Sequence, residues 1–179
     1  MDFARVLADL SRNRAAIQDV QVPRGPGVYA IFLATPGALP GVGEGADGLL
    51  YIGISANLAQ REFDTHFQAG KSGFSTLRRT LGALLRDTLA LTPRPRGSGT
   101  SDINYRNYRF DDAGEDRLSA WMREHLQVGV RPLSYPGDVE RELVRHGQPP
   151  LNLTLWANPG AVAIKAARKA CVDAARAVT

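Results

Sequence analysis

Two short apolar runs, residues 28–33 (VYAIFL) and residues 49–54 (LLYIGI), decide the fold that we expect for this chain. Short runs rich in β-branched and aromatic residues, bounded by Gly and Pro, are typical of β-strands. Because both runs are apolar on both faces, we expect them to be central strands that are covered on each side. A loop rich in Gly and Pro, residues 35–48, separates them, and the simplest pairing of the two strands is antiparallel.

The rest of the chain adds one more clear strand and several helices. Residues 128–133 predict the third strand, and residues 103–110, which alternate aromatic and polar side chains, predict a short edge strand. Helical spacing of apolar residues and capping signals predict helices over about residues 2–17, 57–67, 75–86, 113–125, 137–146 and 160–177. We therefore expect an α+β fold: a small three-stranded, mainly antiparallel sheet flanked by helices, with extra N- and C-terminal helices.

Length and composition indicate one globular domain. The chain has 179 residues, 44% of them hydrophobic and 22% charged, so we expect a single domain over residues 1–179 with its core at about 24–155. The single cysteine, Cys171, excludes an internal disulfide and a cysteine-based zinc site. We predict no membrane partner and a cytoplasmic location, because no apolar run reaches the ~20 residues of a membrane span and none resembles a signal peptide.

The positive charge of the chain is unevenly distributed. The formal net charge is +4, but residues 71–109 hold eight basic against two acidic residues, and the last twenty residues hold four against one. Two basic segments on a small domain favour a polyanionic partner. Composition alone does not decide this point, because charge-rich segments are more often ordinary solvated surface.

One ordered set of residues indicates a catalytic site. Gly27-Val28-Tyr29 opens the first strand, Tyr51-Ile52-Gly53 lies in the second, and Arg61 follows Tyr51 by ten residues. His66 comes next, and a later group consists of Glu140, Leu143, Val144, Pro149 and Asn152. Each piece alone is a weak signal, because strand tyrosines usually only pack and helix carboxylates are usually solvated. Their order and spacing together carry the prediction.

This set resembles the GIY-YIG nuclease superfamily, in particular its branch of small stand-alone members and restriction endonucleases. The first motif has Val in place of Ile, the second matches literally, and the later group matches the family's Glu, its apolar pair, its Pro and its Asn. The sequence departs from the family at two places. His66 stands five residues after Arg61 rather than four, and no Lys follows Gly53 directly.

The resemblance implies a DNA endonuclease that uses Mg²⁺ or Mn²⁺, with Glu140 as the metal ligand. Tyr29 would accept the proton of the attacking water or position that water, and Tyr51 would orient water or phosphate. Arg61 would stabilise the charge of the transition state, and His66 would assist Tyr29. Asn152 would hold the backbone of the site. Helical geometry independently favours Glu140 over Glu142, because Glu140 shares a helix face with the apolar residues three and four positions later.

The basic segments supply the predicted nucleic-acid contacts: Lys71, Arg78, Arg79, Lys165, Arg168 and Lys169. We expect double-stranded DNA as the partner, in restriction or genome defence first and DNA repair second. Cutting both strands with one active site per chain usually requires a homodimer. Two alternatives stay open: a DNA-binding module of this fold that has lost cleavage, and an RNA-binding domain.

Overall fold

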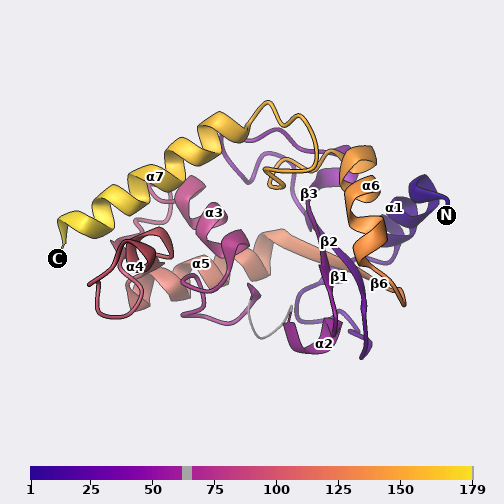
Figure 1. Ribbon diagram of the computed structural model, residues 1–179, viewed down its shortest axis with the longest axis horizontal. Helices are drawn as coiled ribbons and strands as arrows, with labels where there is room; N and C mark the ends of the chain where they lie inside the picture. The colour runs from indigo at the N-terminus through magenta and orange to yellow at the C-terminus, as the bar shows by residue number, and fades with distance from the viewer. Residues whose placement is uncertain (62–65, 179) are drawn as a thin grey trace. The chain divides into compact units, whose positions relative to one another are not determined.

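The computed structural model describes residues 1–61 and 66–178, apart from the side chains of residues 60, 61 and 138 (Figure 1). The chain forms two compact units. The first unit consists of Met1–Phe63 and Arg123–Ala161, and the second consists of Asp64–Met122 and Val162–Thr179.

An antiparallel sheet organises the first unit. Its strands are β1 (Ala15–Ala16), β2 (Gly27–Leu33), β3 (Leu49–Ser55) and β6 (Leu126–Pro132), in the order β1-β6-β2-β3. Every neighbouring pair is antiparallel. The α+β class and the three predicted strands are thus confirmed, and β2 is central and fully buried as expected. The expectation that residues 49–54 also form a central strand is wrong, because β3 is at the edge of the sheet. The two-residue strand β1 was not predicted.

Two helices, α1 (Phe3–Arg12) and α6 (Gly137–Gly147), cover the same face of this sheet (Figure 1). Both contribute to one apolar cluster, which also takes every second side chain of β2. Gly129 of β6 lets α1 approach closely, because a Cβ at this position would lie 2.0 Å from the carbonyl oxygen of Leu10.

The helix predicted over residues 2–17 is shorter than expected. It ends at Arg12, and Ala15 and Ala16 pair with β6 instead.

The remaining described helices of the first unit are short. The 3-10 turn η1 (Ala46–Gly48) precedes β3, and α2 (Leu58–Arg61) follows it. The predicted helix over residues 57–67 thus begins where expected, but residues 62–65 lie outside the described part of the chain. No helix among the described residues is long and apolar enough to cross a bilayer.

The second unit is mainly helical. It contains α3 (Thr76–Leu84), α4 (Asp102–Arg106), most of α5 (Asp112–His125) and nearly all of α7 (Ala161–Ala177). A two-stranded ladder joins β4 (Pro93–Arg94) to β5 (Arg109–Phe110). The edge strand predicted over residues 103–110 is therefore wrong for most of its length.

The spacing of two tyrosines explains this error. Tyr105 and Tyr108 are three residues apart, which puts them on one face of a helical turn but on opposite faces of a strand. The backbone closes such a turn, because the amide of Tyr108 donates a hydrogen bond to the carbonyl of Tyr105 (3.1 Å). Only Arg109 and Phe110 then extend as a strand.

A buried ion pair lies at the centre of the second unit. The guanidinium of Arg78 is 2.8 Å from the carboxylate of Glu115, and both side chains are at most 2% exposed. The hydroxyls of Ser72 and Ser119 complete the pair: both accept from Arg78, and Ser72 donates to Glu115. Arg78 was predicted to contact nucleic acid from the surface. The structure instead gives it a structural role in the core.

Removing one member of this pair should strongly destabilise the second unit. In Glu115→Gln the buried guanidinium of Arg78 loses its counter-charge, so we expect the free energy of unfolding to fall by about 3–5 kcal/mol. Chemical denaturation of the full chain measures this loss. The matched control is Glu142→Gln, which removes the carboxylate of the exposed Glu142–Arg145 pair and should cost less than about 1 kcal/mol. Equal losses in the two variants would contradict this account of the core.

Candidate active site

The two motif tyrosines lie together on one face of the sheet. Tyr29 pairs with Gly53 across β2 and β3, and Tyr51 stands on the same side, with its ring centroid 6.0 Å from that of Tyr29. A Cβ at position 53 would lie 2.4 Å from the phenol oxygen of Tyr29, so the ring of Tyr29 rests directly on the glycine. The glycine of the second motif is therefore required by the tyrosine of the first.

Strand alternation separates these tyrosines from the cluster beneath α1 and α6. Val28, Ala30 and Ile52 alternate with the tyrosines and belong to that cluster, so Tyr29 and Tyr51 occupy the opposite face of the sheet. Helix α2 lies on the tyrosine face, because a Cβ at Gly27 would meet the side chain of Leu58 at 2.6 Å. Arg61 ends α2, but its side chain lies outside the described residues.

Asn152 holds the backbone between Tyr51 and Gly53. Its side-chain oxygen accepts from the amide of Ile52, and its side-chain nitrogen donates to the carbonyl of the same residue, both at 2.9 Å. Asn152 is itself 8% exposed, and its own carbonyl accepts from the indole nitrogen of Trp156 at 2.8 Å. The side chain of Asn152, one hundred positions after Ile52 in the chain, thus fixes the conformation of β3 between Tyr51 and Gly53.

Glu140 lies in the first half of α6. Its carboxylate is half-buried, and it makes no hydrogen bond or ion pair with any described residue, whereas Glu142 pairs with Arg145. Burial raises the pKa of Glu140 above its usual value. Since α6 packs on the face opposite the tyrosines and also contacts the edge strand β3, Glu140 and the tyrosines flank the sheet from different sides.

The other predicted catalytic residue, His66, belongs to the second unit. Its Nδ1 lies 2.7 Å from the hydroxyl of Ser75, the residue that caps α3. The predicted catalytic residues therefore fall into three places. Tyr29, Tyr51 and the backbone of Arg61 share one face of the sheet, Glu140 and Asn152 approach β3 from its edge and opposite face, and His66 is part of the other unit.

The donor set near α6 fits a hydrated divalent cation. Within the described residues there is no cluster of three or more acidic, histidine or cysteine side chains that could enclose a metal ion. Mg²⁺ commonly takes one or two carboxylates and retains several waters, so a single carboxylate without another partner is a suitable ligand. Glu140 meets this condition.

The predicted nucleic-acid residues divide into buried and exposed groups. Arg79 is only 5% exposed and donates to the carbonyl of Ser72 and the hydroxyl of Thr76, so its surface role, like that of Arg78, is not supported. Lys71 is half-buried, with its ammonium 5.9 Å from the ring centre of Phe74. Lys165 and Lys169 are exposed and Arg168 is half-exposed on α7.

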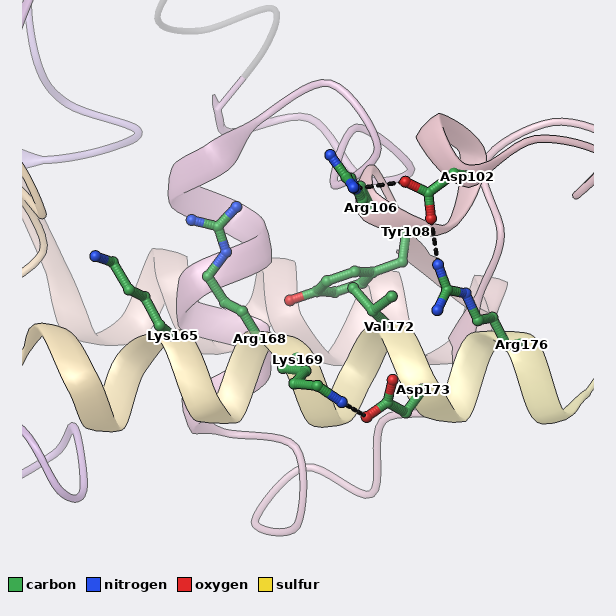
Figure 2. Close-up of a pocket in the computed structure, with 9 residues that line it drawn as sticks. All are labelled: Asp102, Arg106, Tyr108, Lys165, Arg168, Lys169, Val172, Asp173 and Arg176. Carbon is green, nitrogen blue, oxygen red and sulfur yellow. Dashed lines mark hydrogen bonds and ion pairs between the residues drawn. The ribbon is translucent and has the colours of Figure 1, made fainter.

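A basic pocket on α7 was only partly predicted. Beside Lys165, Arg168 and Lys169 it is lined by Arg106 and Arg176 (Figure 2). Arg176 could have been found from the sequence, since it lies on the same helical face, eleven residues after Lys165. Arg106 could not, because it comes from the segment that alternation assigned to a strand.

Comparison with models of known protein families identifies the family of this chain. A family model described as the GIY-YIG catalytic domain matches residues 42–174, well over half of the chain, and the chain belongs to this family of nucleases. The match includes Tyr51, Glu140 and Asn152, and it begins after the strand that carries Tyr29. Searches among curated proteins and among solved structures found no match.

Loss of the Asn152 side chain should loosen β3. In Asn152→Ala the buried amide and carbonyl of Ile52 lose their partners, so we expect the free energy of unfolding to fall by about 2–4 kcal/mol. Denaturant titration of the full chain measures this fall. The exposed Asn13 provides the control, and Asn13→Ala should change stability by about 0.5 kcal/mol or less. A loss as small as that of the control would show that the two hydrogen bonds contribute little.

Glu140 should destabilise the metal-free protein at neutral pH. Its folded-state pKa is raised, so the folded state holds the proton more tightly than the unfolded state, and stability falls as the pH rises through the folded pKa. With a chelator present, we expect Glu140→Gln to be more stable than the native chain at about pH 7 and to show no such gain at about pH 3. Denaturation midpoints at both pH values measure the difference. A gain that does not depend on pH would exclude ionisation as its cause.

Proposed function

We propose that this protein is a divalent-metal-dependent DNA endonuclease that hydrolyses phosphodiester bonds. The main observation in support is the contact between Tyr29, Gly53 and Tyr51 in a chain of the GIY-YIG family. Two phenols on one rigid sheet face, beside a strand held by Asn152, give a preorganised place for a scissile phosphate and its attacking water.

Tyr29 is our choice for the group that positions the water and accepts its proton. Its ring is 3% exposed and is held against Gly53, so its hydroxyl has little freedom. A phenol with an ordinary pKa near 10 is a weak base at neutral pH, and a nearby cation would favour its ionised form. Tyr51, which is more exposed, would orient the water or a phosphate oxygen.

Glu140 would hold Mg²⁺ or Mn²⁺ through its carboxylate, which has no partner among the residues that the structure describes. The bound ion would neutralise negative charge that develops on the phosphoryl oxygens. Because α6 also contacts β3, the strand that carries Tyr51, we place the phosphate beside this strand.

Arg61 completes the proposed site. Arg61 is on the helix that covers the tyrosine face, and a guanidinium suits the charge of a phosphoryl transition state. The assisting role of His66 stays a prediction, because His66 belongs to the second unit and its Nδ1 contacts the hydroxyl of Ser75. We further propose double-stranded DNA as substrate, in restriction or genome defence or in DNA repair, with a homodimer where both strands are cut.

A second function is favoured by a specific observation. His66 belongs to the second unit and bonds Ser75, and the lysine that often follows the second motif is absent. A GIY-YIG domain that binds nucleic acid but has weak or no cleavage would show these features. Cleavage and binding must therefore be measured separately.

Plasmid cleavage with Mg²⁺ tests the proposal. We expect Glu140→Gln to reduce cleavage at least about 100-fold and Tyr29→Phe to reduce it by about 10²–10⁴-fold, because each removes a group that acts in the transition state. Glu142→Gln is the matched control, since it changes the same residue type on the same helix at a side chain that is already paired, and it should retain full activity.

The same preparations, tested for binding in a chelator, separate the alternatives. Intact plasmid with the native chain, together with retained DNA binding, would favour the binding module and contradict the enzyme. Stronger binding to duplex RNA than to duplex DNA would contradict the choice of DNA.

A further inference from the structure

The second unit carries a charged pocket that the proposed chemistry does not use. One face of α7 presents Lys165, Arg168, Lys169, Val172, Asp173 and Arg176, which follow the three- and four-residue spacing of a helix. With Asp102, Arg106 and Tyr108, these residues enclose a pocket of about 440 Å³ (Figure 2). Five cations and two carboxylates line it, a formal net charge of +3.

The charges in this pocket are paired at one end only. Asp102 makes ion pairs with both Arg106 and Arg176, and Asp173 pairs with Lys169. Among the described residues, neither Lys165 nor Arg168 has a hydrogen bond or an ion pair. Figure 2 shows these two side chains extending to the same side of α7, away from Asp173. The uncompensated positive charge is therefore concentrated at the Lys165–Arg168 end.

Another arginine, beneath the pocket, increases the charge at this end. Tyr108, a fully buried residue, forms part of the pocket wall, and its hydroxyl donates to the carbonyl of Arg79 at 2.8 Å. Nε of Arg79 is buried and has no hydrogen-bond partner among the described residues. Burial, and after it repulsion from Arg168, lowers the pKa of Arg79 to about 10. A bound anion would relieve this repulsion.

We infer that the Lys165–Arg168 end of this pocket binds a phosphate group of a nucleic-acid strand, apart from the tyrosine site. The inference rests on the proposed function for the identity of the strand as substrate. Arginine forks onto phosphate oxygens with two parallel hydrogen bonds, and Lys165 supplies a second cation beside it. The pocket thus positions the strand and takes no part in the chemical step.

The length of the basic face favours a strand over a free phosphate. From Lys165 to Arg176 the helix advances by about 16 Å. Phosphates along one strand of a duplex rise by about 3.4 Å per nucleotide, so this face can follow several of them. A free phosphate ion would need only the end at Lys165 and Arg168.

Binding of a labelled duplex DNA in a chelator, measured over a range of salt concentrations, tests the inference. We expect Arg168→Gln to reduce the slope of log affinity against log salt by about 0.9 and to weaken binding about tenfold near 0.1 M salt. Lys165→Gln should act in the same way, and because Lys165 is exposed and unpaired, this variant should fold normally. Arg5→Gln removes the same charge from an exposed residue of α1 and should leave the slope unchanged.

Asp102→Asn provides a test in the opposite direction. This change removes the carboxylate that holds Arg106 and Arg176, so DNA should bind more tightly to this variant than to the native chain. Unchanged or weaker binding would overturn the part of the inference that extends the strand along the face to Arg176, since Arg106 and Arg176 would then not act on the strand.

Competition with inorganic phosphate distinguishes the two sources of the anion. If Arg168→Gln weakens the binding of inorganic phosphate but leaves DNA binding intact, the pocket holds a free phosphate and the inference is wrong. A reduced salt slope without cleavage by the native chain would support the pocket and contradict the nuclease. Cleavage by the native chain, with equal slopes for Arg168→Gln and Arg5→Gln, would support the nuclease and overturn the pocket.

Discussion

The close contact between the phenol of Tyr29 and Gly53 sets the geometry of the first unit. No other residue than glycine has room beneath the ring, because a Cβ would lie 2.4 Å from the phenol oxygen. A shift of β3 by one residue would place a side chain under the ring and move Tyr51 to the other face. The register that brings the two phenols together is therefore enforced by sterics. Asn152 then holds the same stretch of β3 from its outer edge.

The two units solve the burial of polar groups in different ways. Asn152 is neutral and satisfies both backbone groups of one residue, so its burial costs little. Arg78 and Glu115 carry full charges and depend on each other and on two serine hydroxyls. Glu140 has no such partner in the described part of the chain and is half-buried, so it carries a desolvation cost in the metal-free protein. Structural groups here are paired, whereas the proposed metal ligand is left available, which is typical of functional sites.

The sequence predicted the strands well because short runs of β-branched and aromatic residues, as in β2 and β3, favour strands through local preferences alone. It failed over residues 103–110, where the three-residue spacing of Tyr105 and Tyr108 suits a helical turn, and where Tyr108 also donates a hydrogen bond to the carbonyl of Arg79. It also placed Arg78 at the surface, since nothing in the local pattern shows that Glu115 lies beside it in space. The hydrogen bonds between Asn152 and Ile52 likewise could not be predicted from the spacing of apolar residues. The position of Asn152 in the site was expected only from the resemblance to GIY-YIG nucleases.

The hydrogen bonds that Asn152 and its neighbours make to β3 also affect the tendency of this protein to aggregate. β3 is the last strand of the sheet, and an uncovered last strand is a template for aggregation. Several of its backbone groups instead make hydrogen bonds with other parts of the same chain. Gly45 donates to the carbonyl of Leu49, Leu151 donates to that of Leu50, and the side chain of Asn152 occupies both groups of Ile52. The segment after α6 thus covers the edge of β3, where strands of other molecules would otherwise pair.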